Sequence, residues 1–222
     1  MSLYPIFLKL ESHTVLIVGG GAVAEQKIEG VLRSATDVTV IASQVTDRIA
    51  RWAVEGRLKH MATEFRAGMA REYFLVIACT DSEAVNRSVC EEASKSGAIV
   101  NAVDDPEYCD FYAPALVKRG DFQIAVSTGG ASPALAQRVR RELEEKFGPE
   151  YGPWTSSLGR TRTALREVLP PSEGRKQLIR MLALGQPRAN ATDCERNGED
   201  DGRCKTQRLG AKDTRSAETA SA

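Results

Sequence analysis

Two kinds of hydrophobic pattern alternate along the first half of the chain. Short apolar runs, typical of strands that are buried on both faces of a parallel sheet, occur at residues 14–18, 37–42, 73–79 and 99–103. Amphipathic segments that predict helices lie between them, at residues 22–33, 45–56 and 81–95. Residues 58–65 are expected to add a short strand. Strands that alternate with helices through short connections predict a doubly wound parallel sheet of the α/β class.

The pattern changes after Pro106. Residues 115–119 and 122–127 are two short apolar segments on either side of Gly120-Asp121, which predicts an antiparallel hairpin. A long amphipathic helix is expected to follow and to begin at Ser132-Pro133. Serine is a favoured N-cap residue, and proline suits the first helical position because its missing N–H has no partner there.

The last third of the chain combines helices with a polar tail. Gly148-Pro149 and Gly152-Pro153 are expected to break the chain before two shorter helices near residues 154–168 and 172–184. From Gln186 onward large apolar residues are almost absent, which predicts disorder. We therefore expect a dinucleotide-binding domain, a hairpin-plus-helix segment, a helical segment and a disordered tail at residues 1–113, 114–149, 150–185 and 186–222.

Composition narrows the function classes. The 222 residues include 30 Lys and Arg and 30 Asp and Glu, so the formal net charge is zero and no global field favours nucleic acid or an acidic membrane. No apolar run is long enough to cross a bilayer. The five cysteines include no C-x-x-C pair, which fits buried thiols in a reducing compartment, and the cytoplasm is the expected location.

The first apolar run ends in a glycine turn, VGGGAVA, which matches G-x-G-x-x-[G/A] at Gly19, Gly21 and Ala24. In the Rossmann-type fold the first glycine permits a tight turn, the second lets the backbone approach a pyrophosphate, and the small third residue lets helix and strand pack closely. The helix N-terminus then faces the phosphates. Because the motif follows a strand and opens a helix, it predicts a dinucleotide site more strongly than a plain tight turn.

The second strand does not end in the Asp or Glu that usually binds the ribose hydroxyls of NAD. Ser43 and Gln44 stand there and can still hydrogen-bond a ribose. No arginine is present there to favour NADP, so NAD is the expected cofactor.

Polar residues follow two further strands at the edge where ligands bind in open sheets. Thr80 and Asn101 are candidates for the nicotinamide side of the cofactor. Asp104, just beyond a strand end, is the best-placed carboxylate for proton transfer. The alternative is that Asp104 or Asp105 simply begins a turn before Pro106.

A possible anion site lies in the second half of the chain. The loop Thr128-Gly129-Gly130 precedes a helix and can receive a carboxylate at its N-terminus, or it can serve only as hairpin exit and helix cap. Lys118, Arg119 and Arg138 are candidate cations for an acidic substrate, with a solvated surface as the alternative. The chain has two histidines and no His/Cys cluster, so no tightly held metal is expected.

Several of these motifs occur together in one protein family. The chain resembles the precorrin-2 dehydrogenase and sirohydrochlorin ferrochelatase module of siroheme synthases over about residues 1–184. The pairing of N-x-V-D with S-[ST]-G-G-x-S-P-x-L-A is the specific part of the resemblance. The matching stretches are residues 3–10, 15–27, 78–86, 101–106, 111–127 and 127–136.

The resemblance implies a reaction and residue roles. NAD would accept a hydride from precorrin-2 and sirohydrochlorin would form, with the family's key aspartate at Asp104. Family cofactor contacts fall on Ala22, Val23, Ser43 and Gln44. The resemblance therefore implies that the absence of an Asp or Glu at the end of the second strand is typical of this family. Thr128 stands where better-known bifunctional members carry serine. The family also implies a homodimer interlocked through the middle and C-terminal parts of the chain.

Two alternatives stay open from the sequence. Some family members also insert Fe²⁺ into sirohydrochlorin, and one aspartate could serve both reactions. A module that senses NAD without catalysis would use the same glycine turn, but it would have no need of a positioned carboxylate at Asp104.

Overall fold

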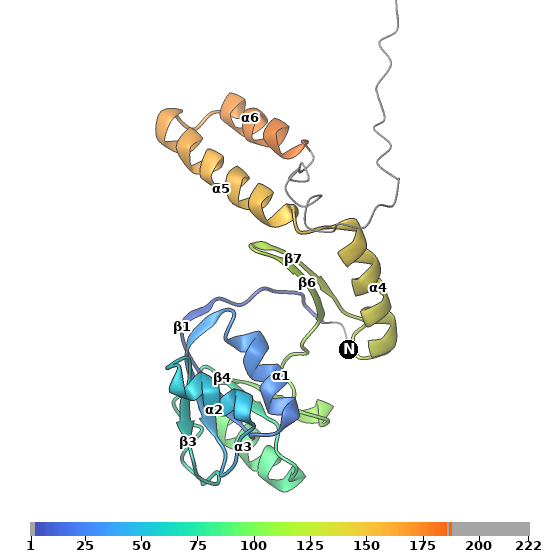
Figure 1. Ribbon diagram of the computed structural model, residues 1–222. Helices are drawn as coiled ribbons and strands as arrows, with labels where there is room; N and C mark the ends of the chain where they lie inside the picture. Colours follow the sequence, from blue (N-terminus) through green and yellow to red (C-terminus); the bar gives the residue numbers. More distant parts are fainter. Residues whose placement is uncertain (1–2, 186, 188–222) are drawn as a thin grey trace, which may run out of the picture. The chain divides into compact units, whose positions relative to one another are not determined.

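The computed structural model describes residues 3–185 and 187. A parallel sheet of five strands has the order β3-β2-β1-β4-β5 (Figure 1). The strands are β1 (Leu10–Val18), β2 (Ala35–Ile41), β3 (Lys59–Met61), β4 (Leu75–Ala78) and β5 (Ile99–Ala102). The chain order reverses between β1 and β4, where open α/β sheets bind their ligands. The predicted doubly wound sheet is confirmed.

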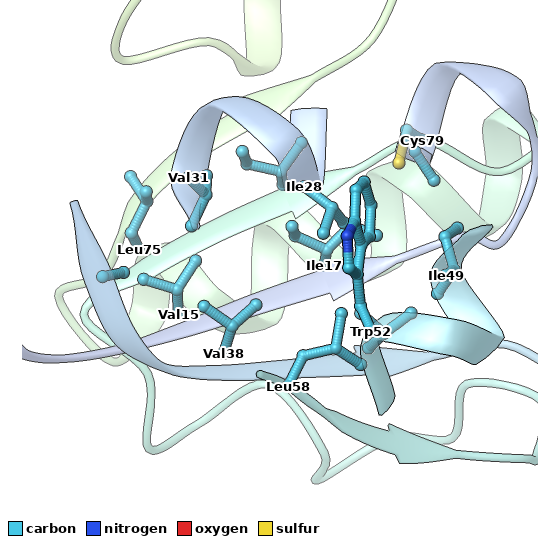
Figure 2. Packing of buried hydrophobic residues seen from close by; sticks show 14 of the residues in the cluster. Val15, Ile17, Ile28, Val31, Val38, Ile49, Trp52, Leu58, Leu75 and Cys79 are labelled. Carbon is cyan, nitrogen blue, oxygen red and sulfur yellow. The ribbon is translucent and has the colours of Figure 1, made fainter. Parts of the chain in front are cut away.

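Helices bury both faces of this sheet, because successive residues of a strand point to opposite sides. Val15 and Ile17 of β1 belong to a core that includes Ile28 of α1 (Ala22–Val31) and Trp52 of α2 (Asp47–Val54) (Figure 2). The alternate residues of β1 belong to a second core, with Val89 of α3 (Glu83–Lys95). This two-sided burial explains why the strands are continuous apolar runs.

The first strand is longer than its apolar run predicts. It begins at Leu10 rather than residue 14, and the pairing with β2 is irregular between Leu10 and Thr14. Residues 11–14 are exposed or half-buried, so they carry polar side chains and lack the sequence pattern of a buried strand.

Beyond the sheet, η1 (Pro106–Tyr108) is a short 3-10 turn, and the predicted hairpin forms a two-stranded sheet. The elements of this part are β6 (Ala115–Arg119), β7 (Phe122–Val126), α4 (Pro133–Lys146), α5 (Tyr151–Val168) and α6 (Glu173–Ala183). The described residues separate into two compact units: residues 3–118 with 123–146, and residues 119–122 with 147–185. No helix among the described residues is both long and apolar enough to span a membrane.

Gly152-Pro153 does not break the chain, contrary to expectation, and lies in the first turn of α5. Gly152 is buried there, and a Cβ on it would lie 3.3 Å from the carbonyl carbon of Arg119. Glycine therefore lets the helix start lie against the hairpin turn. Pro153 is tolerated because the first N–H groups of a helix have no partner within it.

The second unit has a small aromatic core. Phe122 of β7 lies 5.4 Å from Phe147 and 5.1 Å from Tyr151 between ring centroids. Trp154 extends the cluster at 5.7 Å from Tyr151. Of the predicted disordered tail, only residue 187 falls within the described residues.

Candidate active site

The glycine turn between β1 and α1 is shaped by the strand beside it. Gly19 has φ of 132°, a conformation that side chains rarely adopt. A Cβ on Gly19 would overlap the carbonyl of Cys79, at 2.8 Å from its carbon. The Gly19 N–H donates to the Ile41 carbonyl at 3.0 Å. Only glycine permits β1, β2 and β4 to meet this closely at their carboxyl ends.

Gly20 is constrained by the loop that follows β2. A Cβ on Gly20 would overlap the carbonyl oxygen of Gln44 and lie 2.9 Å from the Ala42 Cβ. The Gly20 carbonyl also accepts a hydrogen bond from the Thr46 N–H at 3.0 Å. The loop carrying Ser43 and Gln44 therefore lies directly on the glycine turn.

Gly21 differs from its two neighbours because it faces open space. A Cβ there would meet no atom within 4 Å, and no side chain caps the N-terminus of α1. Ala22 and Val23, which begin the helix, are exposed. Free N–H groups at a helix start, with room for a ligand beside them, fit the pyrophosphate of a dinucleotide.

The loop after β2 is held in place by polar contacts. The His60 ring Nε2 lies 2.9 Å from the Ala42 carbonyl oxygen. Thr46 donates to the Glu25 carboxylate at 2.6 Å, and Arg48 pairs with the same carboxylate at 3.4 Å. Ser43 and Gln44 stay exposed. This arrangement leaves both side chains available to a ribose next to the pyrophosphate position.

Thr80 lies at the end of β4 in a closed network with Asn86 of α3. The buried Asn86 side chain accepts the Thr80 N–H at 2.9 Å and the Thr80 hydroxyl at 2.8 Å. Its amide nitrogen donates to the Thr80 carbonyl at 3.0 Å. The network fixes the loop after β4, next to the Cys79 carbonyl that contacts Gly19.

Asn101 holds the loop beyond β5. It is buried, and its amide nitrogen donates to the Phe111 carbonyl at 2.9 Å and lies 3.3 Å from the Cys109 sulfur. These contacts occupy the side-chain amide of Asn101, which is the group that would contact a cofactor. A direct contact of Asn101 with the nicotinamide stays a prediction.

Asp104 stands at the beginning of the turn after β5, with an exposed side chain. Its φ of 62° makes it the only residue other than glycine with positive φ among the described positions. Asp tolerates this region better than most residues, but such a conformation still marks a constrained position. The carboxylate is therefore presented by a fixed turn at the same sheet edge as the glycine turn.

The substrate candidates have local contacts of their own. The Thr128 hydroxyl accepts the Ser132 N–H at 3.0 Å, and Gly129 and Gly130 have φ of 61° and 85° with open space at the Cβ position. Arg119 donates to the Phe147 carbonyl at 3.1 Å. Arg138 pairs with Glu142 at 3.4 Å on the exposed face of α4.

Lys118, at the end of β6, is half-buried and interacts with other groups. The binding roles of Lys118, Arg119, Arg138 and the Thr128 loop stay predictions. No group of three or more metal-ligating side chains gathers anywhere in residues 3–185 and 187.

Comparison with known families finds matches to two consecutive parts of the chain. Residues 6–115 match an NAD(P)-binding family, and residues 119–146 match the central part of sirohaem biosynthesis proteins. A solved structure, SirC, precorrin-2 dehydrogenase, superposes with a TM-score of 0.69 and 30% sequence identity. That match covers 82% of this chain and 88% of SirC.

The chain belongs to the precorrin-2 dehydrogenase and siroheme synthase family. The siroheme synthase of Neisseria meningitidis serogroup C is 38% identical over 169 residues, which are 76% of this chain and 35% of the relative. That of Actinobacillus pleuropneumoniae is 34% identical over 186 residues, 84% of this chain and 38% of the relative. The chain thus spans little more than a third of these curated relatives. The predicted cofactor class, a nicotinamide dinucleotide, is confirmed.

Sequence reasoning did not single out four residues whose contacts support the candidate site. They are Gly20, His60, Asn86 and Arg87, the last of which donates to Asp105 at 3.2 Å. Asn86 carried a detectable signal, since a polar residue on the inner face of an amphipathic helix is unusual. Gly20 lies at the variable position of G-x-G, so its spacing gave no reason to single it out.

The thiols beside the site are expected to be unreactive. Burial raises the pKa of Cys79 and of Cys90 to about 12, so both stay protonated at about pH 8. Iodoacetamide should modify neither residue in the native protein and both after denaturation, as read by peptide mass spectrometry. Rapid native modification of Cys79 would show that the turn around Gly19 is open.

Proposed function

We propose that this chain catalyses the NAD-dependent dehydrogenation of precorrin-2 to sirohydrochlorin. The observation that carries the proposal is the structural match to SirC, precorrin-2 dehydrogenase, which covers 88% of SirC and 82% of this chain. The names of the siroheme synthase relatives support the same pathway. The name of SirC, a precorrin-2 dehydrogenase, supports the reaction class, an oxidoreductase that acts on a CH–CH group with NAD as acceptor.

Different residues of the chain would bind the cofactor and remove the proton in such a reaction. The turn at Gly19-Gly20-Gly21 and the start of α1 would hold the pyrophosphate, and the loop with Ser43 and Gln44 would hold the ribose. Bound NAD supplies a hydride acceptor. Loss of hydride leaves a proton to be removed, and the exposed Asp104 carboxylate is the base that we assign to it. Hydride and proton together account for the two hydrogens lost from precorrin-2.

The acidic side chains of precorrin-2 call for cations and N–H donors. The Thr128-Gly129-Gly130 loop precedes α4 and has open space at the Cβ positions of both glycines, which supports a role in holding a carboxylate at the helix N-terminus. Arg138 on the same helix would add charge. Substitution of Arg138 by glutamine is the natural test of that finer assignment, through the KM for precorrin-2.

The proposal is tested by incubating the full chain anaerobically with precorrin-2, with and without NAD. Conversion to sirohydrochlorin, followed by absorption, should depend on NAD. Equal conversion without NAD, or none with it, would overturn the proposal. Binding of NAD without any conversion would favour the sensing alternative.

Iron insertion is a separate reaction that the same samples can test. Fe²⁺ added to sirohydrochlorin and the purified chain should give siroheme faster than Fe²⁺ alone if the chain is also a chelatase. Equal rates would restrict it to the dehydrogenation step.

A homodimer is the partner arrangement that we propose. Helix α6 has no buried residue, and its apolar side chains include Met181 at 66% and Leu182 at 39% exposure. A second copy of the chain would cover them, as the family resemblance implies. Light scattering should give twice the chain mass of 24.2 kDa, whereas a monomer would remove this part of the proposal.

A further inference from the structure

Asp105, the residue after Asp104, is the point where the turn is anchored. Its side chain is only 14% exposed, although it lies in a surface turn. Its carbonyl accepts the Tyr108 N–H at 3.2 Å and the Cys109 thiol at 3.3 Å. Contacts to Asp105 therefore act on the backbone that holds Asp104.

The Asp105 carboxylate is held from outside the turn, by Arg87 of α3. The Arg87 Nε donates to Asp105 Oδ2 at 3.2 Å, while a terminal nitrogen pairs with Glu83 one helical turn earlier, at 2.5 Å. The guanidinium carbon also lies 5.9 Å from the centre of the Tyr108 ring, within η1. One arginine thus joins the helix to both ends of the turn.

The helix holds this turn at a second point. The Tyr108 hydroxyl donates to Glu91 at 3.4 Å, and Glu91 lies four residues after Arg87 on the same face of α3. The preceding residue, Asn86, holds the loop after β4 through Thr80. Neighbouring positions of α3 therefore fix the loops that follow β4 and β5.

The Arg87 side chain is half exposed, at 49%. Ion pairs with an exposed partner contribute little to the free energy of unfolding. Asp104, however, adopts a left-handed conformation that a non-glycine residue keeps only when its surroundings impose it. The contact should therefore matter for the geometry of the turn more than for the stability of the fold.

We propose that Arg87 is a positioning residue for the dehydrogenase: by holding the Asp105 carboxylate, it keeps the Asp104 carboxylate where it takes the substrate proton. The proposal rests on the dehydrogenase function proposed above. Arg87 itself contacts neither substrate nor cofactor in this assignment. Arg87 therefore affects the rate of the proton-transfer step. NAD binding depends on the glycine turn and not on Arg87.

The test compares Arg87→Gln, Arg87→Lys and Arg33→Gln in the full chain. Arg33 is the matched control, since it is 51% exposed and pairs with Glu29 four residues earlier on α1. Arg87→Gln should lower kcat by about tenfold or more, because small misplacements of a reacting group cost at least that much. The affinity for NAD and the melting temperature should not change. Arg87→Lys should recover part of kcat, because its ammonium can still pair with Asp105.

Hydrogen–deuterium exchange of residues 103–111 gives a readout that needs no activity. Exchange in this peptide should rise in Arg87→Gln and stay unchanged in Arg33→Gln. Wild-type kcat in Arg87→Gln, a loss of NAD affinity equal to the loss of kcat, or unchanged exchange would each overturn the positioning role. Raised exchange in a chain whose wild-type form makes no NADH would instead overturn the dehydrogenase function alone.

Discussion

Asp104→Ala should abolish turnover while NAD still binds. Loss of a general base lowers the rate by about 10²-fold or more. Asp104 lies in the turn after β5 and not in the glycine turn, so NAD binding should be retained. The expected result is therefore a collapse of kcat at an unchanged dissociation constant for NAD. Steady-state rates and calorimetric titration of the same preparation measure both quantities.

Asp104→Asn distinguishes the effect of the carboxylate on the rate from the effect of the turn geometry. Asparagine tolerates positive φ about as well as aspartate, so the turn should keep its shape while the base is lost. Glu107→Ala is the matched control, since Glu107 is another exposed carboxylate in the same turn. Full activity of Asp104→Asn would remove Asp104 from the mechanism.

The three glycines of the turn should respond differently to substitution. Gly21→Val should fold normally and bind NAD about tenfold or more weakly, because the added side chain enters open space at the helix start. Gly20→Ala should instead lower the free energy of unfolding by about 1–3 kcal/mol, because its Cβ overlaps the Gln44 carbonyl. Thermal unfolding and NAD titration distinguish the two effects.

Gly30→Ala is the control for this series. Gly30 lies within α1 with open space at its Cβ position, so alanine should stabilise the chain by about 0.5–1 kcal/mol and leave NAD binding intact. Normal NAD affinity in Gly21→Val would contradict the assignment of the pyrophosphate to this turn.

The sequence predicted the sheet well because its strands are buried on both faces. Continuous apolar runs such as residues 14–18 are distinctive, and a glycine motif directly after one of them placed Gly19 and Gly21 correctly in the turn. The exposed start of β1 at Leu10 had no such pattern. Gly152 was misjudged, because its close approach to Arg119 is a tertiary contact.

The contacts that hold the candidate site in place could not be predicted from the sequence pattern. Arg87 and Asp105 are eighteen residues apart, and only the packing of α3 beside β5 brings them together. Gly20 meets the loop of Gln44 for a similar reason. The sequence motifs located the groups proposed for chemistry, whereas the contacts that hold them depend on the three-dimensional fold.

The central claim is that one chain removes both hydrogens from precorrin-2 and passes the hydride to NAD. Sirohydrochlorin and NADH quantified in the same anaerobic reaction test it most directly. The account predicts that they form in equal amounts, and that both fail to form with Asp104→Asn. Sirohydrochlorin without matching NADH would contradict it.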